Sequence, residues 1–190
     1  DGRLAKQTML RSETHHAYSA LSSLQLLTAK PIMYVFNGSE YQIRDHWNPD
    51  QALITQCGNA SWVAVSAKIE SELSELSQEE RKEFLTELNL PNTDLDYFIQ
   101  LSYKTLNLMT FFTTGEDESR AWTIPVDASA PRAGRAIHSD FEEKFIRAEV
   151  INWQKLLEAG SWTHARERGL LRTEGKTYIV QDGDVIEFKI

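Results

Sequence analysis

A short polar motif, Asn37-Gly38-Ser39-Glu40, carries the side chains with the most specific chemical potential in this sequence. It follows an apolar run over residues 31–36, and a short apolar run bounded by turn residues predicts a buried strand. Nucleotide-binding α/β domains place base-reading side chains at the carboxyl ends of buried parallel strands. We therefore interpret residues 37–40 as a candidate base reader.

A phosphate-binding loop should accompany such a motif, and the sequence does not supply one. The nearest match is Gly175-Lys176-Thr177. In a phosphate loop, four residues separate the first glycine from the Gly-Lys pair, and a helix follows that pair directly. Here five residues separate Gly169 from Gly175, and residues 177–180 predict a strand. The sequence also lacks a Gly-x-Ser-x-Gly elbow and a His-Glu-x-x-His helix, so no complete catalytic site is visible.

Composition describes an ordinary globular chain of one or two domains, with 190 residues, 41% hydrophobic and 25% charged. No apolar run approaches the roughly eighteen residues of a membrane helix, so we expect a cytoplasmic protein with no membrane association. Cys57 is the only cysteine, which rules out an internal disulfide and a thiolate metal cluster. The sequence starts at Asp1 without an initiator methionine, which favours a fragment.

The net charge of -8 is spread unevenly along the chain. Residues 1–119 contain 9 Lys and Arg against 17 Asp and Glu, whereas residues 120–190 contain 11 of each. The second region can therefore present a basic face even though the whole chain repels polyanions, and a solvated mixed-charge surface is the simpler alternative. The cations available for such a face are Arg132, Arg135, Lys144, Arg147, Arg166, Arg168, Arg172 and Lys176.

Strands and helices alternate in the first region, which predicts an α/β fold. Helical spacing of apolar residues predicts a helix over residues 15–26, and apolar runs predict strands over residues 31–36 and 62–68. Ser77 and Glu80 form a capping box for the next helix, which Pro91 closes. Thr93 caps a further helix with a predicted inward face of Leu95, Phe98, Ile99 and Leu106.

From residue 108 onward the pattern changes to short strands. Residues 110–115 and 119–125 predict a hairpin, and residues 148–153 predict a third strand. Ser139 and Glu142 predict a capping box for a helix over residues 140–146, with Phe141 and Phe145 in the core. Two short helices then lead to predicted strands over residues 177–180 and 185–190, separated by a tight turn at Asp182-Gly183. This order predicts a small mixed sheet wrapped over one helix, the β-grasp arrangement.

Several motifs of this sequence resemble those of the YchF family of Obg-related ATPases. The first region contributes LTAKPIMYVFNGSE, SAKIESEL and SQEERKEFL. The second contributes the more specific FFTTGEDESRAWTIPVDASAPRAGRAIHSDFEEKFIRAEV and YIVQDGDVIEF. The resemblance covers essentially the whole chain, but only about the C-terminal half of a full family member.

This resemblance implies an α/β chain with three segments. Residues 1–30 would be the end of a helical arm, residues 31–107 the C-terminal part of a P-loop nucleotide-binding domain, and residues 108–190 a β-grasp (ubiquitin-like) TGS domain. It also implies ATP with Mg²⁺ as the cofactor of the parent protein, whose phosphate loop and Mg²⁺ ligands would lie upstream of Asp1. We therefore expect the chain alone to be inactive as an ATPase.

The resemblance further implies a preference for ATP over GTP. Most GTPases carry Asn-Lys-x-Asp, whose aspartate accepts two hydrogen bonds from guanine, whereas this chain has the Asn-x-x-Glu of YchF proteins. Adenine lacks the N1 hydrogen and the 2-amino group that donate these two bonds in guanine. An aspartate placed for guanine would therefore stay unpaired beside adenine, at a cost of roughly 1–3 kcal/mol. The base-contacting residues implied by the family are Asn37, Gly38, Ser39, Glu40, Ser66, Ala67 and Lys68.

For the second region the resemblance implies association with the ribosome or RNA, and we expect no DNA partner. The implied phosphate contacts are Arg132, Arg135, Lys144 and Arg147, with His138 either a polar surface contact or a packed turn residue. Where the family usually has Lys-Gly, this chain has Glu143-Lys144, which alters the local charge. Two functions stay open: part of an ATP-binding regulatory ATPase, or a stand-alone TGS module that docks to ribosome, RNA or protein without hydrolysing nucleotide.

Overall fold

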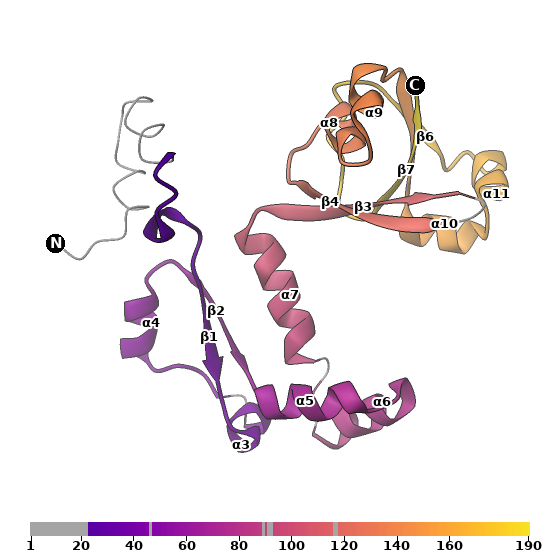
Figure 1. Ribbon diagram of the computed structural model, residues 1–190. Coiled ribbons are helices and arrows are strands. Elements are labelled where there is room, and N and C mark those ends of the chain that lie inside the picture. Colours follow the sequence, from indigo (N-terminus) through magenta and orange to yellow (C-terminus); the bar gives the residue numbers. More distant parts are fainter. Residues whose placement is uncertain (1–22, 46, 89, 91–92, 116–117) are drawn as a thin grey trace. The chain divides into compact units, whose positions relative to one another are not determined.

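The computed structural model describes residues 23–45, 47–88, 90, 93–115 and 118–190, and the chain divides into two compact units (Figure 1). Unit 1 ends at Leu106, and unit 2 spans Asn107–Ile190. Most of the helix predicted over residues 15–26 lies outside the described residues, as does Pro91, and these parts stay predictions. The predicted end of that helix is wrong, because residues 24–26 are not helical and Gln25 has a φ of +47°.

Unit 1 is built on a two-stranded parallel sheet. The strands β1 (Met33–Asn37) and β2 (Ser61–Val65) pair from Met33 opposite Ser61 to Asn37 opposite Val65. Parallel strands need a crossover connection, and here it contains two short helices, α3 (Glu40–Arg44) and α4 (Gln51–Cys57). A 3-10 helix, Leu27–Ala29, precedes β1. Because the two strands end side by side, the residues that follow them meet at one edge of the sheet.

Three capped helices follow β2. Ser66 caps α5 (Ala67–Glu75), Ser77 caps α6 (Gln78–Glu87), and Thr93 caps α7 (Asp94–Thr105). The predicted capping box is confirmed, since the Ser77 N–H donates to Glu80 Oε2 at 2.9 Å. A small buried cluster joins α3, α5 and the end of α6, and it consists of Ile43, Ile69, Leu73 and Leu88.

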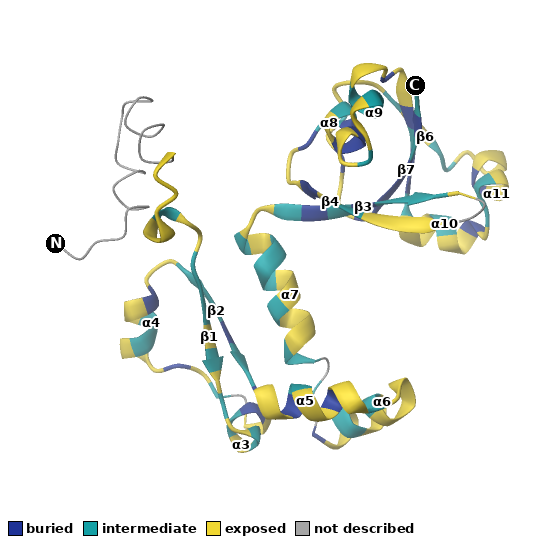
Figure 2. Cartoon of the chain, in the orientation of Figure 1, coloured by how far each residue is buried: buried dark blue, intermediate teal, exposed yellow. Residues whose placement is uncertain are grey.

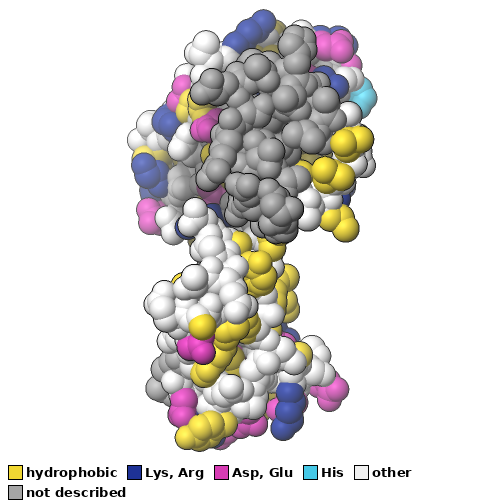
Figure 3. Space-filling view, turned by 90° about the vertical axis from the view of Figure 1, so that its left-hand side faces the viewer, with side chains coloured by type: hydrophobic (Ala, Val, Ile, Leu, Met, Phe, Trp, Pro, Cys, Tyr) yellow, Lys and Arg dark blue, Asp and Glu magenta, His cyan; other side chains and the backbone are white. Residues whose placement is uncertain are grey.

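Two sequence expectations for unit 1 are wrong. The strand predicted over residues 62–68 stops at Val65 because Ser66 caps α5, which makes Lys68 helical. The predicted inward face of α7 is mostly exposed: Leu95, Ile99 and Leu106 are 48%, 45% and 56% accessible. Helical spacing identifies an apolar stripe but not the element that covers it. Figure 3 shows hydrophobic side chains gathered on the surface of unit 1.

Unit 2 contains a five-stranded mixed sheet with the order β4-β3-β7-β5-β6. The predicted hairpin is confirmed, because β3 (Leu108–Thr114) pairs antiparallel with β4 (Ser119–Pro125). The last strand, β7 (Asp184–Lys189), is parallel to β3 and antiparallel to β5 (Arg147–Asn152). A short strand, β6 (Arg172–Glu174), pairs with β5 at the far edge.

Helices cover both faces of this sheet. The main core, around Phe111 and Phe188, lies under α8 (Ala130–Arg135) and α9 (Ser139–Glu143). A second cluster lies under α10 (Trp153–Ala159) and α11 (Trp162–Glu167). Neighbouring strand residues point to opposite faces, so Val150 and Ile186 join the first cluster while Ile151 and Val185 join the second. Figure 2 shows the buried residues along these strands.

Two further expectations fail in unit 2. The helix predicted from a Ser139 capping box instead begins after His138, whose Nδ1 accepts a hydrogen bond from the Asp140 N–H at 3.2 Å, and it ends at Glu143. Residues 177–180 form no strand, because their backbone groups pair with the loop before α8. Within this segment, Ile179 makes one isolated bridge to Ser129. The prediction of a core position is confirmed for Phe145, whereas Phe141 is half-buried and packs against the same cluster.

The predicted tight turn at Asp182-Gly183 is present and leads directly into β7. Asp182 Oδ1 accepts a hydrogen bond from the Thr110 N–H at 2.8 Å. Gly183 has a φ of +80°, and a Cβ there would lie 2.7 Å from Trp153 Cδ1, so both conformation and space require glycine. Asp182 therefore has a structural partner in β3.

Candidate functional site

The ends of β1 and β2 bring the predicted base-reading residues together. Asn37 lies opposite Val65, and the Gly38 N–H donates to the Val65 carbonyl at 2.8 Å. Asn37 Oδ1 accepts a hydrogen bond from the Ala67 N–H at 3.1 Å. This bond joins the segment after β1 to the start of α5, so the structure places residues 37–40 beside residues 66–68.

Ser39 and Glu40 start helix α3 at this edge. Ser39 caps the helix, with its N–H donating to Gln42 Oε1 at 2.9 Å. The Glu40 carboxylate lies 3.8 Å from Lys68 Nζ and 3.9 Å from Arg44 Nη1. Because these exposed pairs are long, they are weak and leave the side chains free to rearrange around a ligand.

A cavity of about 500 Å³ lies at this edge. Two cations and one carboxylate border it, which favours an anionic ligand. Sequence reasoning missed Tyr41 and Arg44, although both directly follow the motif within α3. The lining residues are Asn37, Gly38, Ser39, Glu40, Tyr41, Arg44, Ser66 and Lys68.

Ser66 is fully buried and is held by groups distant in sequence. Its Oγ accepts a hydrogen bond from the Ile69 N–H at 3.4 Å, and its own N–H donates to Asp94 Oδ2 at 3.1 Å. Nearby, Glu70 Oε1 accepts a hydrogen bond from the Leu95 N–H at 3.1 Å. Burial raises the pKa of both carboxyl groups, Asp94 and Glu70. The start of α7 therefore supports the loop that borders the candidate site, and no local sequence signal revealed this.

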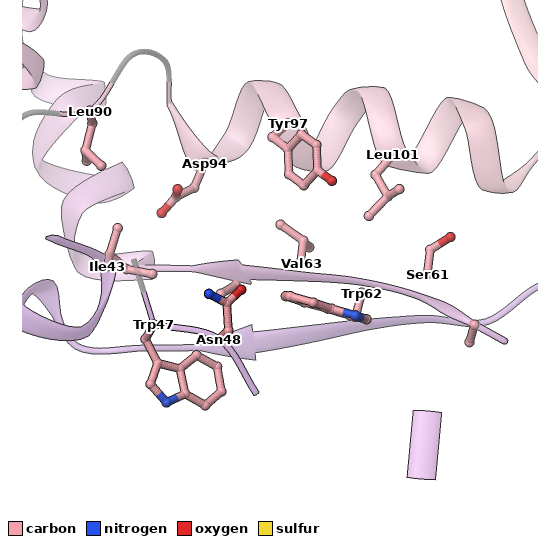
Figure 4. Close-up of a pocket in the computed structure, with 12 residues that line it drawn as sticks. Ile43, Trp47, Asn48, Ser61, Trp62, Val63, Leu90, Asp94, Tyr97 and Leu101 are labelled. Atoms are coloured by element: carbon pink, nitrogen blue, oxygen red, sulfur yellow. The ribbon is translucent and has the colours of Figure 1, made fainter. Parts of the chain in front are cut away.

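A second cavity of about 590 Å³ lies between α7 and the strands of unit 1 (Figure 4). Asp94, Tyr97 and Leu101 face it from α7, and Val63 and Trp62 border it from β2. Its lining is mainly apolar, and no sequence pattern indicated this cavity.

The predicted RNA-contacting cations do not form one uncompensated basic patch. Arg135 Nη1 lies 2.8 Å from Glu142 Oε2, and Lys144 Nζ lies 2.7 Å from Asp140 Oδ2. These pairs raise the pKa of Arg135 and of Lys144 and lower the pKa of Asp140. His138 is exposed and acts as the helix cap described above. Arg132 and Arg147 are exposed, and no described carboxylate lies within ion-pair distance of either.

Within the described part of the chain, no group of three His, Cys, Asp or Glu side chains could hold a metal ion. In the same residues, no helix has both the length and the apolar character needed to cross a membrane. Cys57 is buried and unpaired by any disulfide. The candidate site is therefore the polar edge of the parallel sheet, without a metal centre among these residues.

Comparison with protein families gives a match over unit 2. Residues 108–190 match the YchF-GTPase_C family model, which is described as a protein of unknown function (DUF933). The chain is also 46% identical, over 180 residues, to the Ribosome-binding ATPase YchF of Bacillus subtilis (strain 168), covering 93% of this chain and 49% of that protein. The corresponding protein of Mycoplasma genitalium is 43% identical over 194 residues, covering 99% and 52%.

A solved structure gives the same relation. The YchF GTPase of Schizosaccharomyces pombe is 32% identical with a TM-score of 0.78, over 94% of this chain and 48% of that one. The chain thus spans about half the length of the curated relatives it matches. The names of these relatives differ on the nucleotide, since the bacterial proteins are called ATPases and the yeast protein a GTPase.

Proposed function

Since this chain belongs to the YchF family across the half of its relatives that it spans, we propose that unit 1 binds the adenine base of ATP at the ends of β1 and β2. The observation that carries this proposal is the hydrogen bond from the Ala67 N–H to Asn37 Oδ1. It fixes the Asn37 amide at the sheet edge and leaves its Nδ2 as a donor toward a base. Arg44 and Lys68 border the same cavity and would attract an anionic nucleotide.

The position of Glu40 supports selection against guanine. Its carboxylate lies 3.8 Å from Lys68 Nζ and 3.9 Å from Arg44 Nη1, so a base would compete with these two cations for it. A shorter aspartate at this position would be placed for the two guanine donors and would stay unpaired beside adenine. ATP preference is thus proposed to follow from the absence of a guanine-specific carboxylate.

Among the described residues, no group of three His, Cys, Asp or Glu side chains could hold a metal ion by itself. We therefore derive no hydrolytic step for this chain. The proposed role of unit 1 is to hold and select the base, while phosphate and Mg²⁺ binding in the family's whole proteins would depend on other residues.

Calorimetric titration of the full chain with Mg-ATP and Mg-GTP tests this proposal. We expect ATP to bind more tightly than GTP, and Glu40→Asp to shift the preference toward GTP. Glu72→Asp is the matched control, because Glu72 also lies near Lys68, at 3.7 Å, but does not border the cavity. Equal binding of both nucleotides by the unsubstituted chain, or no binding of either, would overturn the proposal.

For unit 2 we propose a TGS domain of the β-grasp type that associates with the ribosome, in the cytoplasm. A hairpin, a helical segment and a central β7 parallel to β3 support this assignment, as does the ribosome-binding name of the relatives. The buried clusters of unit 2 consist of its own residues, which supports the second function to the extent that it needs a stand-alone module. The predicted contact residues Arg132, Arg135, His138, Lys144 and Arg147 remain candidates, and Arg147 is exposed with no described carboxylate at ion-pair distance.

Cosedimentation with ribosomes tests this second proposal. We expect Arg147→Glu to weaken association and Arg168→Glu, an exposed charge reversal at the C-cap of α11, to leave it unchanged. Loss of binding with both variants would indicate a general charge effect and contradict a specific role of Arg147.

A further inference from the structure

The outer edge of β4 lacks a neighbouring strand in the described sheet. β4 is the terminal strand of the order β4-β3-β7-β5-β6, and it runs for seven residues. Five of its side chains are exposed; only Ile124 is buried and Trp122 half-buried. A long exposed edge presents backbone donors and acceptors that another extended chain can use.

The register shows which backbone groups face outward. The Gly115 N–H donates to the Glu118 carbonyl at 2.9 Å, and the Val126 N–H donates to the Asn107 carbonyl at 2.9 Å. Antiparallel pairs alternate between hydrogen-bonded and non-hydrogen-bonded, so the pairs bonded between these two ends are Thr113–Arg120, Phe111–Trp122 and Met109–Ile124. The N–H and C=O groups of Ser119 and Ala121 therefore point away from β3.

A groove of about 500 Å³ lies at the carboxyl end of this edge. Ile124 and Pro125 of β4 border one side, and Arg132 and Arg135 from the last turn of α8 border the other. The groove thus combines apolar strand residues with two guanidinium groups next to the open edge.

The charge of the groove favours a carboxylate ligand. No described carboxylate lies within ion-pair distance of Arg132, and Arg135 is held only by the exposed pair with Glu142. A third arginine, Arg120, stacks over the Trp122 ring at 4.7 Å toward the other end of the strand. Arginine forms bidentate hydrogen bonds with carboxylates, and an incoming carboxylate could share or replace Glu142 as the partner of Arg135.

We propose that unit 2 binds an extended acidic peptide segment of a partner protein, which pairs with the outer edge of β4 and places a carboxylate between Arg132 and Arg135. Strand addition of this kind gains affinity from main-chain hydrogen bonds and specificity from side-chain pockets. A peptide fits better than RNA, because the alternating donors and acceptors of Ser119 and Ala121 match a strand and not a phosphate backbone. The inference goes beyond the proposed nucleotide and ribosome roles and requires neither.

Fluorescence anisotropy with the full chain tests this inference. The probe is a short fluorescein-labelled peptide of alternating valine and threonine that ends in glutamates. We expect it to bind, and Arg132→Glu to weaken binding about tenfold or more, because a charge-assisted pair is lost and a repulsion gained. A peptide with lysines in place of the glutamates should not bind.

Ala121→Pro separates strand addition from simple charge attraction. Proline removes an N–H that faces away from β3, so the β3–β4 ladder should survive, while pairing of the probe should be lost. Ala121→Ser keeps that N–H and should bind like the unsubstituted chain. Unchanged binding in Ala121→Pro, or absence of binding by the unsubstituted chain, would overturn the proposal. Labelled single-stranded RNA that binds in place of the peptide and responds to Arg132→Glu but not to Ala121→Pro would assign the groove to nucleic acid instead.

Discussion

The two units of this chain differ in how their sheets are buried. Unit 1 has two parallel strands and a small buried cluster around Ile69 and Leu73. Unit 2 has five strands with helices over both faces and two buried clusters. Because hydrophobic stabilisation grows with the apolar surface removed from water, we expect unit 2 to be the more stable unit. Amide exchange that is slower in β1 and β2 than in β5 and β7 would contradict this expectation.

The two units also differ in where their polar side chains lie. In unit 1, Asn37, Ser66 and Lys68 meet at the open ends of the strands, supported by a few hydrogen bonds. In unit 2, the buried carboxylate of Asp184 is enclosed by partners and faces no cavity described for the unit. The polar edge of the unit 1 sheet is open to a ligand, whereas the enclosed Asp184 carboxylate stabilises the fold of unit 2.

Removing the aromatic ring at the centre of unit 2 should change the difference in stability between the two units more than any other substitution considered. Phe111 is fully buried, and its ring centroid lies 5.9 Å from that of Phe188. We expect Phe111→Ala to lower the free energy of unfolding of unit 2 by about 3–5 kcal/mol, because it leaves a cavity. Urea unfolding followed by amide exchange should show faster exchange in β7 and little change in β2. Equal acceleration in β2 would show that the two units unfold together.

Asp184 tests the polar part of the same core. Its carboxylate is 2% exposed and accepts hydrogen bonds from the Tyr178 hydroxyl at 2.7 Å and the Gln181 N–H at 2.9 Å, with Arg172 Nη2 at 3.3 Å. Asp184→Ala should cost about 3 kcal/mol, because it leaves these donors and a cation without their acceptor. The exposed Asp182, which accepts one bond from the Thr110 N–H, is the control, and Asp182→Ala should cost only about 1 kcal/mol. Similar losses in both variants, measured by thermal unfolding, would contradict the assigned role of burial.

Tyr178 gives this network a pH dependence. Burial and its hydrogen bond to Asp184 raise the pKa of the Tyr178 hydroxyl from 10.0 to about 12. The folded chain then keeps a proton that the unfolded chain has released, so the contribution is complete below pH 10 and is lost as the pH rises toward about 12. Tyr178→Phe should cost about 2 kcal/mol at neutral pH, since a hydrogen bond to a charged group is lost. It should also flatten the alkaline fall in stability, and an unchanged alkaline profile would contradict this assignment.

Sequence patterns predicted the elements whose signals are local. The strand before Asn37, the cap at Ser77 and the β3–β4 hairpin depend on neighbouring residues, and all three are present. The meeting of Asn37 with Ala67 could also be expected, because parallel strands end at the same edge of a sheet.

Features that depend on distant partners could not be predicted in this way. Asp94 lies 28 residues from Ser66, and nothing in either local pattern indicates their hydrogen bond. No local pattern distinguishes the buried Asp184, whose partners Tyr178 and Arg172 lie 6 and 12 residues away. His138 displaced Ser139 as a helix cap because its imidazole reached the Asp140 N–H, which a preference for hydroxyl caps does not anticipate.

Ser66 connects the stability of unit 1 to its candidate site. Ser66→Ala removes the cap of α5 and should cost about 1 kcal/mol of the free energy of unfolding of unit 1. It should also weaken ATP binding if the segment 66–68 frames the base as proposed. Ser77→Ala is a matched control, since it removes the cap of α6 away from the cavity. If both variants changed the affinity for ATP equally, the proposed role of residues 66–68 in framing the base would be contradicted.

Asp94→Asn should have the smallest effect and sharpens the contrast with Asp184. Burial raises the pKa of Asp94, so its charged form is disfavoured in the folded chain and stability is lost as the pH rises upward from 3.8. Asparagine keeps an oxygen acceptor for the Ser66 N–H without the desolvated charge, so we expect a change of only a few tenths of a kcal/mol at neutral pH. The dependence of unit 1 stability on pH above 3.8 should become shallower, which chemical denaturation at several pH values can measure. A large loss of stability at neutral pH would mean that the negative charge itself holds the start of α7 against Ser66, as the charge of Asp184 does in unit 2.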